Sequence, residues 1–266
     1  MPEGDTVFLT AHRLHEALAG KTLTGGEVRH PRLAAVTFAG RLVTEVVPVG
    51  KHLFVRFDDD RSLHSHLRMD GSWHLYAPGE RWRMPGHHAR VVLVAADREA
   101  VGFRLHDLDL VPRAREGRYV DRLGPDLLVP QWTPAHQAEA ERRLAARPDR
   151  AFGLALLDQS VVAGIGNVYV NELCFLVGTS PHAPVSDVPE YVRGEVLAKA
   201  RELLWDNRLR VARTTTGSTA RGSRHWVYDR ARRPCRRCGT PVATTRLGDE
   251  PEARTSWFCP RCQPAP

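Results

Sequence analysis

The hydrophobic positions near the start of the chain follow the period of an α-helix. Behind Asp5, apolar side chains recur at helical spacing until Gly20 ends the pattern. From residue 23 to residue 112 the pattern changes to short runs rich in Val, Leu and Phe, separated by Gly, Pro and Asp. The clearest runs, at 42–49, 53–57, 63–67 and 90–94, predict strands. We therefore expect one helix followed by a two-layer β-sandwich.

Helical periods return after a connector at 111–134 that is punctuated by Pro and Gly. Thr133 and Pro134 are typical of an N-cap and a first helical residue, and predict a helix that continues to about residue 146. Further helices are predicted over 152–159, 168–177 and 187–207. A polar loop begins near residue 214, and residues 226–228 resemble a strand in composition.

Four of the five cysteines form two C-x2-C pairs separated by twenty residues. They are Cys235, Cys238, Cys259 and Cys262. Thiolates at this spacing are typical of a tetrahedral zinc site, and the residues between the pairs are expected to form a hairpin. Two disulfides are the alternative, which the absence of a secretion signal disfavours. We expect one structural Zn2+ ion per chain, because four protein ligands leave no open position for catalysis.

These patterns together predict an α+β fold with four segments. Residues 1–120 form the helix and β-sandwich, 121–133 a linker, 134–222 a helical domain, and 223–266 a zinc-binding module. No stretch approaches the roughly 20 apolar residues that span a bilayer, and the charged N-terminus is unlike a signal peptide. We expect a soluble monomer of the cytoplasm and nucleoid that is neither secreted nor bound to membranes.

The charge balance suits a polyanionic partner. Thirty-eight Lys and Arg residues stand against thirty-one Asp and Glu residues, which gives a formal net charge of +7. Many basic proteins bind no nucleic acid, so charge alone leaves the partner open. The tetrad 164–167 (Gly-Ile-Gly-Asn) adds a second indication, since two glycines before a helix expose backbone N–H groups to a phosphate. By itself this tetrad also fits a tight turn between helices.

The N-terminus carries candidate chemistry. The small residue at position 2 favours removal of Met1, which would leave the secondary amine of Pro2 at the chain end. An α-amino group with a pKa of about 7.7–8.0 is appreciably neutral at cellular pH and can attack an electrophilic carbon. The adjacent Glu3 is placed to act as general acid and base. Many chains begin Met-Pro-Glu without any such role.

Four motifs, considered together, resemble one known family. They are Met1-Pro2-Glu3-Gly4, Gly50-Lys51, the stretch from Leu157-Asp158-Gln159 to Asn167, and the cysteine module with Arg254-Thr255-Ser256-Trp257-Phe258-Cys259. In this order they resemble the formamidopyrimidine-DNA glycosylase/endonuclease VIII family over essentially the whole chain. Pro-Glu-Gly at the start, rather than Pro-Glu-Leu-Pro, is similar to the endonuclease VIII branch.

The resemblance implies a bifunctional DNA glycosylase/AP lyase of base excision repair with a helix–two-turn–helix domain. In that family the Pro2 amine would form a Schiff base with the sugar of damaged DNA, Glu3 would move protons, and β,δ-elimination would follow. Lys51 would bind a phosphate and support the active site. Asn167 and Arg254 would be the phosphate ligands of the helix–two-turn–helix domain and the zinc finger.

The segment 65–71 resembles the family loop that enters the DNA helix. Met69 is then expected as the wedge that fills the gap left by the extruded nucleotide, with His66 near a phosphate. The triplet Arg68-Met69-Asp70 departs from the Gln-Leu-Tyr of the endonuclease VIII pattern. The short polar segment 214–224 favours oxidised pyrimidines and abasic sites. A purine-directed enzyme with the same mechanism, and a zinc-dependent DNA-binding protein without catalysis, remain the alternatives.

Overall fold

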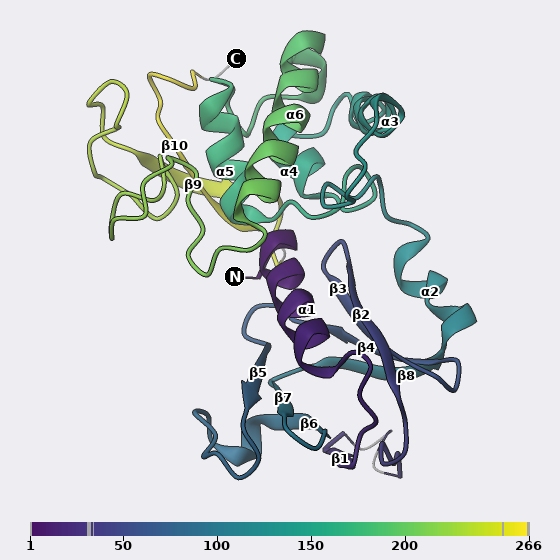
Figure 1. Ribbon diagram of the computed structural model, residues 1–266. Coiled ribbons are helices and arrows are strands. Elements are labelled where there is room, and N and C mark those ends of the chain that lie inside the picture. The colour runs from purple at the N-terminus through teal and green to yellow at the C-terminus, as the bar shows by residue number, and fades with distance from the viewer. Residues whose placement is uncertain (1, 31–32, 34, 252, 265–266) are drawn as a thin grey trace. The chain divides into compact units, whose positions relative to one another are not determined.

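The computed structural model describes residues 2–30, 33, 35–251 and 253–264 (Figure 1). The chain divides into two compact units, Met1–Asp121 and Arg122–Pro266, which we describe separately. Among the described residues, no helix is both long and apolar enough to cross a lipid bilayer.

The N-terminal unit is a helix followed by two four-stranded sheets, as the sequence predicts. Helix α1 spans Gly4–Leu18. One sheet has the order β2-β3-β4-β8 and the other the order β1-β6-β7-β5, with every neighbouring pair antiparallel. The strands are β1 Gly25–Val28, β2 Val43–Val49, β3 His52–Phe57, β4 Arg61–His66, β5 Ser72–Tyr76, β6 Ala89–Val94, β7 Glu99–Phe103 and β8 Asp107–Pro112.

Helix α1 is held to this unit by one buried stripe. Val7, Ala11, Leu14 and Leu18 follow the helical period and are all buried in the core that also contains β3 and β4 side chains. Burying each Leu stabilises the fold by about 1.5–3 kcal/mol relative to exposure. The helix ends where Gly20 adopts a φ of 75°, a conformation that costs glycine little. Pro2 and Glu3 therefore precede a helix that is packed in the core.

The connector predicted at 111–134 contains short helices that its composition did not reveal. A 3₁₀ turn, η3, spans Arg113–Arg115, and helix α2 spans Gly117–Val120. Buried Glu116 explains this local order, since its carboxylate accepts hydrogen bonds from Arg56 and Ser62 on β3 and β4. The charge network ties the segment to the sheet.

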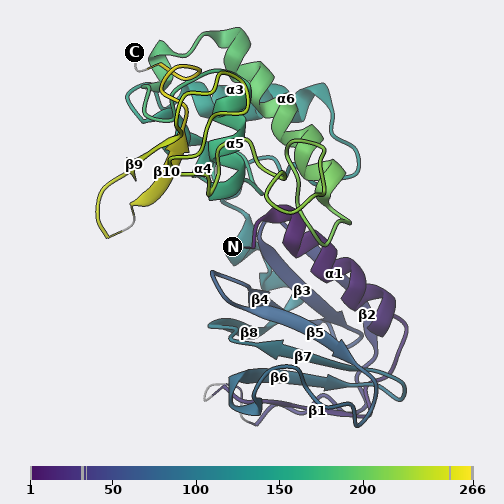
Figure 2. The same ribbon diagram turned by 90° about the vertical axis from the view of Figure 1, so that its left-hand side faces the viewer.

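The C-terminal unit contains four helices, a 3₁₀ turn and a two-stranded hairpin (Figure 2). The helices are α3 Pro134–Ala145, α4 Phe152–Leu157, α5 Asn167–Leu176 and α6 Glu190–Asn207, with η4 at Val185–Asp187. The predicted cap of α3 is confirmed, because the Thr133 side chain accepts a hydrogen bond from the His136 amide and Pro134 is the first helical residue. Helix α6 begins at Glu190 rather than 187, because the preceding residues form the 3₁₀ turn.

The region between the two cysteine pairs forms the predicted hairpin. Strands β9 Ala243–Leu247 and β10 Arg254–Phe258 pair antiparallel, with Arg254 opposite Leu247. The strand expected at 226–228 is wrong. That segment is a turn whose backbone N–H groups donate to the carboxylate of Glu172 instead of to a neighbouring strand. The predicted α+β fold class is otherwise confirmed.

Candidate active site and metal centre

Pro2 and Glu3 lie at the N-terminal end of α1. Pro2 is half-buried, and Glu3, the N-cap residue of the helix, is fully buried. The Glu3 carbonyl accepts the first hydrogen bond of the helix, from the Val7 amide at 3.0 Å. The N-terminal end of a helix carries a partial positive charge. The amine of a processed Pro2 would lie close to that positive charge.

Lys51 lies in the tight turn between β2 and β3. Gly50 has a φ of 57°, which glycine adopts without strain, and the half-buried Lys51 follows it. Burial is the main cause that lowers the pKa of His52 and His66, and the positive charge of Lys51 adds a smaller contribution to both. Lys51 therefore belongs to the same local electrostatic environment as His66.

A cluster of imidazoles joins β3 and β4, and the sequence analysis did not predict it. His52 Nδ1 lies 2.9 Å from His64 Nε2, the His52 and His66 rings are 5.0 Å apart, and His64 stacks on Tyr119 at 3.7 Å. Burial is the main cause that lowers the pKa of His52 and His66 to about 4 and that of His64 to about 3. All three imidazoles are therefore neutral at pH 7.

The hydrogen bonds of His66 define its tautomer. His66 Nδ1 accepts a hydrogen bond from the Arg68 amide at 3.1 Å, so the ring proton lies on Nε2. His66 can thus offer a phosphate a neutral N–H donor rather than a positive charge. The nearby carboxylate of Asp107 pairs with Arg68, and Arg68 lowers the Asp107 pKa against the opposing effect of burial.

Met69 projects from a tight loop between β4 and β5. Its side chain is 61% exposed, one of the few large hydrophobic residues at the surface. The loop closes through a 2.8 Å hydrogen bond from the Gly71 amide to the Leu67 carbonyl. A Cβ atom on Gly71 would lie 2.5 Å from that carbonyl oxygen, so the turn requires glycine. The loop presents an apolar side chain on a constrained backbone.

Asp70, the acidic residue of the triplet at 68–70, has partners of its own in this unit. Its carboxylate lies 3.5 Å from His106 Nε2 and 3.8 Å from Arg104 Nη1, both on the segment between β7 and β8. The acidic charge is therefore directed toward basic groups of a neighbouring loop.

Asn167 and Arg254 lie close together in the C-terminal unit. Asn167 is the first residue of α5, is 5% exposed, and donates from Nδ2 to the Thr255 carbonyl at 2.9 Å. Arg254, the residue before Thr255, is exposed at the start of β10 and lines a cleft with Arg150 and Asp158. A carboxamide has two N–H donors, and among the described residues only one of them has an acceptor. The structure thus joins the helix end to the hairpin that carries Arg254.

Glu172 anchors the segment that leads into the cysteine module, and sequence reasoning missed it. Its fully buried carboxylate accepts hydrogen bonds from the amides of Trp226, Val227 and Tyr228 at 2.7, 2.9 and 2.8 Å. The hydroxyl of Thr215 donates to the same carboxylate. Four donors compensate the burial of one negative charge. No local pattern reveals this role, because the partners lie more than forty residues away in sequence.

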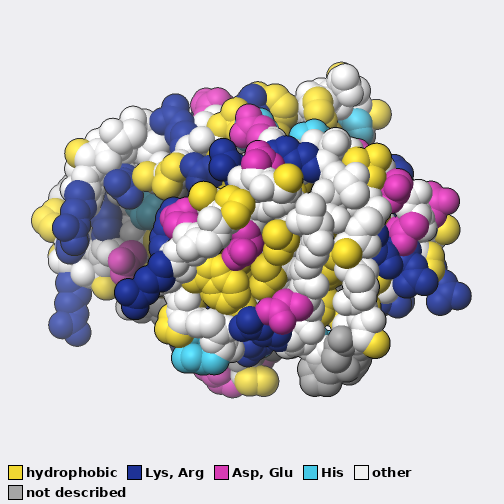
Figure 3. Space-filling model, turned by 60° about the horizontal axis from the view of Figure 1, so that its bottom comes forward, with side chains coloured by type: hydrophobic (Ala, Val, Ile, Leu, Met, Phe, Trp, Pro, Cys, Tyr) yellow, Lys and Arg dark blue, Asp and Glu magenta, His cyan; other side chains and the backbone are white. Residues whose placement is uncertain are grey.

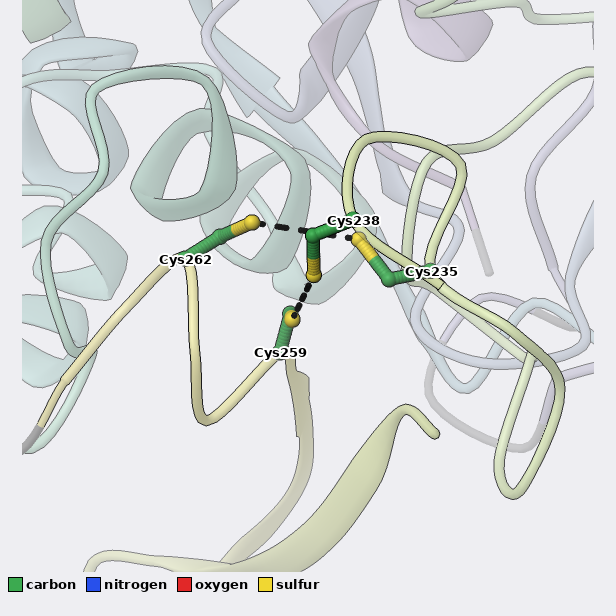
Figure 4. A group of neighbouring side chains, drawn as sticks. All are labelled: Cys235, Cys238, Cys259 and Cys262. Atoms are coloured by element: carbon green, nitrogen blue, oxygen red, sulfur yellow. Dashed lines mark hydrogen bonds between the residues drawn. The ribbon is translucent and has the colours of Figure 1, made fainter. Parts of the chain in front are cut away.

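The four predicted cysteine ligands converge on one point (Figure 4). Their sulfur atoms all lie within 4.8 Å of one another, and two pairs, Cys235–Cys262 and Cys238–Cys259, are 3.9 and 3.5 Å apart. These distances exceed the 2.03–2.05 Å of a disulfide, and all four cysteines are free. A tetrahedron with metal–sulfur bonds of about 2.3 Å has edges of about 3.8 Å. The cluster can hold a metal ion of that geometry.

The protonation of the thiols is consistent with a bound cation. Burial and the neighbouring cysteines raise the pKa of Cys262 to about 12. Hydrogen bonds from Thr240 lower the pKa of Cys238 to about 6. One thiolate therefore forms readily, whereas further negative charge in the cluster requires compensation by a cation.

Comparison with known proteins agrees with this architecture. The model of the formamidopyrimidine-DNA glycosylase N-terminal domain matches residues 1–108, and that of the formamidopyrimidine-DNA glycosylase H2TH domain matches residues 123–218. The chain is 51% identical to the probable endonuclease 8 2 of Streptomyces coelicolor over 100% of its length and 95% of that protein. It is 49% identical to the DNA-(apurinic or apyrimidinic site) lyase Nei2 of Mycolicibacterium smegmatis, with both chains covered completely.

A solved structure supports the fold alone. The crystal structure of Lactococcus lactis formamidopyrimidine-DNA glycosylase bound to abasic-site DNA superposes with a TM-score of 0.82 at 22% identity. The alignment covers 99% of this chain and 100% of that one.

The chain belongs to the formamidopyrimidine-DNA glycosylase family, a class of DNA-repair glycosylase/AP lyases. Within it, the full-length relatives near 50% identity carry the names endonuclease 8 2 and Nei2, so the predicted endonuclease VIII-like branch is confirmed. In the C-terminal unit, the Asn167 side chain contacts Thr255, the residue after Arg254.

Proposed function

We propose that this protein excises oxidised pyrimidines from DNA and cleaves the resulting abasic site, with the Pro2 amine as nucleophile. The observation that carries the proposal is the position of Pro2 and Glu3 at the N-terminal end of α1, in a chain with full-length lyase relatives. The positive end of the helix disfavours an ammonium group nearby, which supports a neutral, nucleophilic amine.

The chemistry follows from these two residues. The Pro2 nitrogen attacks C1′ of the damaged nucleotide, the glycosidic bond breaks, and the base leaves with a proton. Glu3 protonates the ring oxygen as the sugar opens, and the amine loses its proton to give an iminium with C1′. The iminium acidifies C2′, so loss of a C2′ proton expels the 3′ phosphate. A second elimination expels the 5′ phosphate and leaves the sugar fragment on Pro2 until water hydrolyses it.

Other side chains of the N-terminal unit are assigned to binding. Lys51 supplies a compact positive charge for a backbone phosphate, and His66 supplies the neutral Nε2–H donor described above. Met69 enters the space of the extruded nucleotide, which its exposure and constrained loop support.

The C-terminal unit is assigned to holding DNA. Asn167 and Arg254 bind backbone phosphates from the end of α5 and from β10, within a helical domain at 134–222 and a zinc module at 223–266. Zn2+ in the four-cysteine cluster supplies a structural link between the two loops that carry the ligands, and it takes no part in the reaction. The sulfur–sulfur spacing supports this assignment.

Borohydride trapping tests the proposal. An oligonucleotide with one abasic site is mixed with the wild-type protein, a Pro2→Gly variant and a protein extended by several residues at the N-terminus. Reduction of the iminium should give a covalent adduct with the wild type, a strongly reduced yield with Pro2→Gly, and none with the extended protein. Equal adduct yields from all three would refute Pro2 as nucleophile, and no adduct from any would favour a DNA-binding protein without catalysis.

A second comparison addresses the base. The wild-type protein is expected to cleave duplexes with thymine glycol faster than duplexes with 8-oxoguanine opposite cytosine. The opposite order would indicate the purine-directed alternative while leaving the Schiff-base mechanism intact.

A further inference from the structure

The positive charge of this chain is concentrated in one short segment. Between Arg221 and Arg237, seven arginines stand against a single acidic residue, Asp229. This segment of seventeen residues has a net charge of +6, while the whole chain has +7. The rest of the protein is therefore almost neutral. Lys and Arg side chains gather at the left-hand edge of the face drawn in Figure 3, on the side where Figure 1 labels β9 and β10.

The segment folds around a pocket of about 390 Å³ that none of the assigned site residues lines. Four arginines contribute most of its positive charge: Arg221, Arg224, Arg230 and Arg233. Arg221 and Arg233 are exposed, whereas Arg224 and Arg230 are partly buried. Asp229 is the acidic residue of the lining. We call this feature the arginine pocket.

The arginines of the pocket differ in their partners from the arginines that form ion pairs in this structure. Arg56, Arg143 and Arg150 all form ion pairs with carboxylates in this structure. Within the described part of the chain, the four pocket arginines form none. Arg224 donates instead to the Thr219 carbonyl, and Arg230 to the carbonyls of Trp226 and Pro234. Carbonyl partners orient the side chains without neutralising their charges.

The surroundings of Arg230 disfavour the positive charge of its guanidinium group. Burial, followed by the charges of Arg236 and Arg233, lowers the pKa of its guanidinium. Its Nε–H is buried and has no hydrogen-bond partner among the described residues. An anion in the pocket would relieve the repulsion among these arginines.

The wall of the pocket is held rigidly before any ligand arrives. Glu172 binds the three amides that begin at Trp226, and Arg236 donates to the carbonyls of His225 and Gly222. Glu172 lies five residues after Asn167 on α5, about 7.5 Å along the helix axis at 1.5 Å per residue. Helix α5 therefore carries both Asn167 and the carboxylate that holds one side of the pocket.

We propose that the arginine pocket binds one backbone phosphodiester of the DNA, in addition to those assigned to Asn167 and Arg254. The inference rests on the proposed function for the identity of the polyanion. Planar guanidinium groups match phosphate oxygens in pairs, which favours arginine over lysine at such a site. Because this segment holds nearly all of the excess positive charge, phosphate binding in the pocket adds its own contribution to the decrease of DNA affinity with rising salt concentration.

The test measures duplex affinity against NaCl concentration for three zinc-loaded proteins. They are the wild type, the double variant Arg221→Gln/Arg233→Gln, and Arg98→Gln. The double variant removes two exposed side chains that form no ion pair among the described residues, so the fold is expected to remain intact. Arg98 is a matched control, because it is an exposed arginine of the β6–β7 turn whose side chain donates only to the Asp97 carbonyl. One phosphate contact contributes about 0.9 to the slope of log K against log salt.

The double variant should therefore lose about 0.9 from this slope and about eightfold in affinity near 0.1 M NaCl. Arg98→Gln should retain the wild-type slope, and Asp229→Asn should bind DNA more tightly. An unchanged slope in the double variant, or an equal change in Arg98→Gln, would refute phosphate binding by the arginine pocket. A loss seen only with 5′-phosphorylated duplexes would also overturn it, since it would identify a terminal phosphate as the ligand.

Borohydride trapping at low salt and saturating protein separates the two proposals. The double variant should form the abasic-site adduct as completely as the wild type. If the wild type forms no adduct, the proposed catalysis is refuted, and the salt slopes still show whether the arginine pocket binds a DNA phosphate. If trapping succeeds and the slopes coincide, only the pocket fails.

Discussion

Replacing Glu172 by glutamine should weaken the hydrogen bonds that hold residues 226–228 in place, without changing the shape of the side chain. Oε1 of Glu172 accepts the amides of Val227 and Tyr228, and Oε2 accepts that of Trp226 and the Thr215 hydroxyl. A carboxamide keeps only one acceptor oxygen. Its NH₂ group can face the hydroxyl, which also accepts hydrogen bonds, but the Trp226 amide then loses its acceptor.

The cost follows from these contacts. A buried N–H without an acceptor costs about 1–3 kcal/mol, and two hydrogen bonds that lose their charge assistance cost about 1 kcal/mol each or less. The total is about 3 kcal/mol, which corresponds to roughly 100-fold faster exchange of these amides through local opening.

Hydrogen exchange of the peptide containing residues 226–228 measures this directly. Thr215→Val serves as control, because it keeps the carboxylate and removes only the hydroxyl, which lies against Glu172 and the Arg224 carbonyl. A loss of about 1 kcal/mol should accelerate exchange less than about tenfold. If these amides exchange in Glu172→Gln at rates within a few-fold of those in the wild type, the carboxylate does not anchor this segment.

Three further predictions follow from the site. Cys238→Ser should lose its bound zinc, measured by metal analysis, and most of its DNA affinity, while the N-terminal unit keeps its thermal transition; retained DNA affinity would contradict the role of the module. The histidine cluster should make stability depend on pH, since the folded-state pKa values of about 3 to 4 lie below the ordinary 6.5. The contribution of the cluster to stability is then complete above about pH 6.5 and is lost toward about pH 4. The free energy of unfolding in urea, plotted against pH in this range, should have a slope for His64→Gln that is smaller than the wild-type slope by up to about 1.4 kcal/mol per pH unit. Gly71→Ala should distort the turn at Leu67 and reduce excision from duplexes more than cleavage at single-stranded abasic sites; equal effects on both would argue against Met69 as the wedge.

Local patterns predicted the elements whose determinants lie close together in sequence. Helix α1 follows from its apolar period, and α3 from the cap at Thr133. The cysteine cluster follows from spacing, because two tight turns suffice to bring the pairs together. The strand expected at 226–228 failed because Glu172, distant in sequence, offers those amides a better acceptor than a neighbouring strand.

Features that depend on the register of distant strands were not predictable. His52 meets His66 because β3 and β4 pair these two positions, and a one-residue shift would move either side chain to the opposite face. Tyr119 joins the cluster from the short helix α2, which sits in a connector without helical periodicity. The arginine pocket is lined by one short segment whose charge is visible in the sequence, but the hold of the distant Glu172 on that segment is not.

The central claim is a covalent bond between the Pro2 nitrogen and a deoxyribose carbon, and peptide mass spectrometry of the borohydride-trapped complex tests it most directly. Digestion should yield the N-terminal peptide without Met1, carrying the reduced sugar remnant on residue 2. A remnant located on Lys51 or another lysine, or efficient cleavage by protein that still retains Met1, would contradict the account.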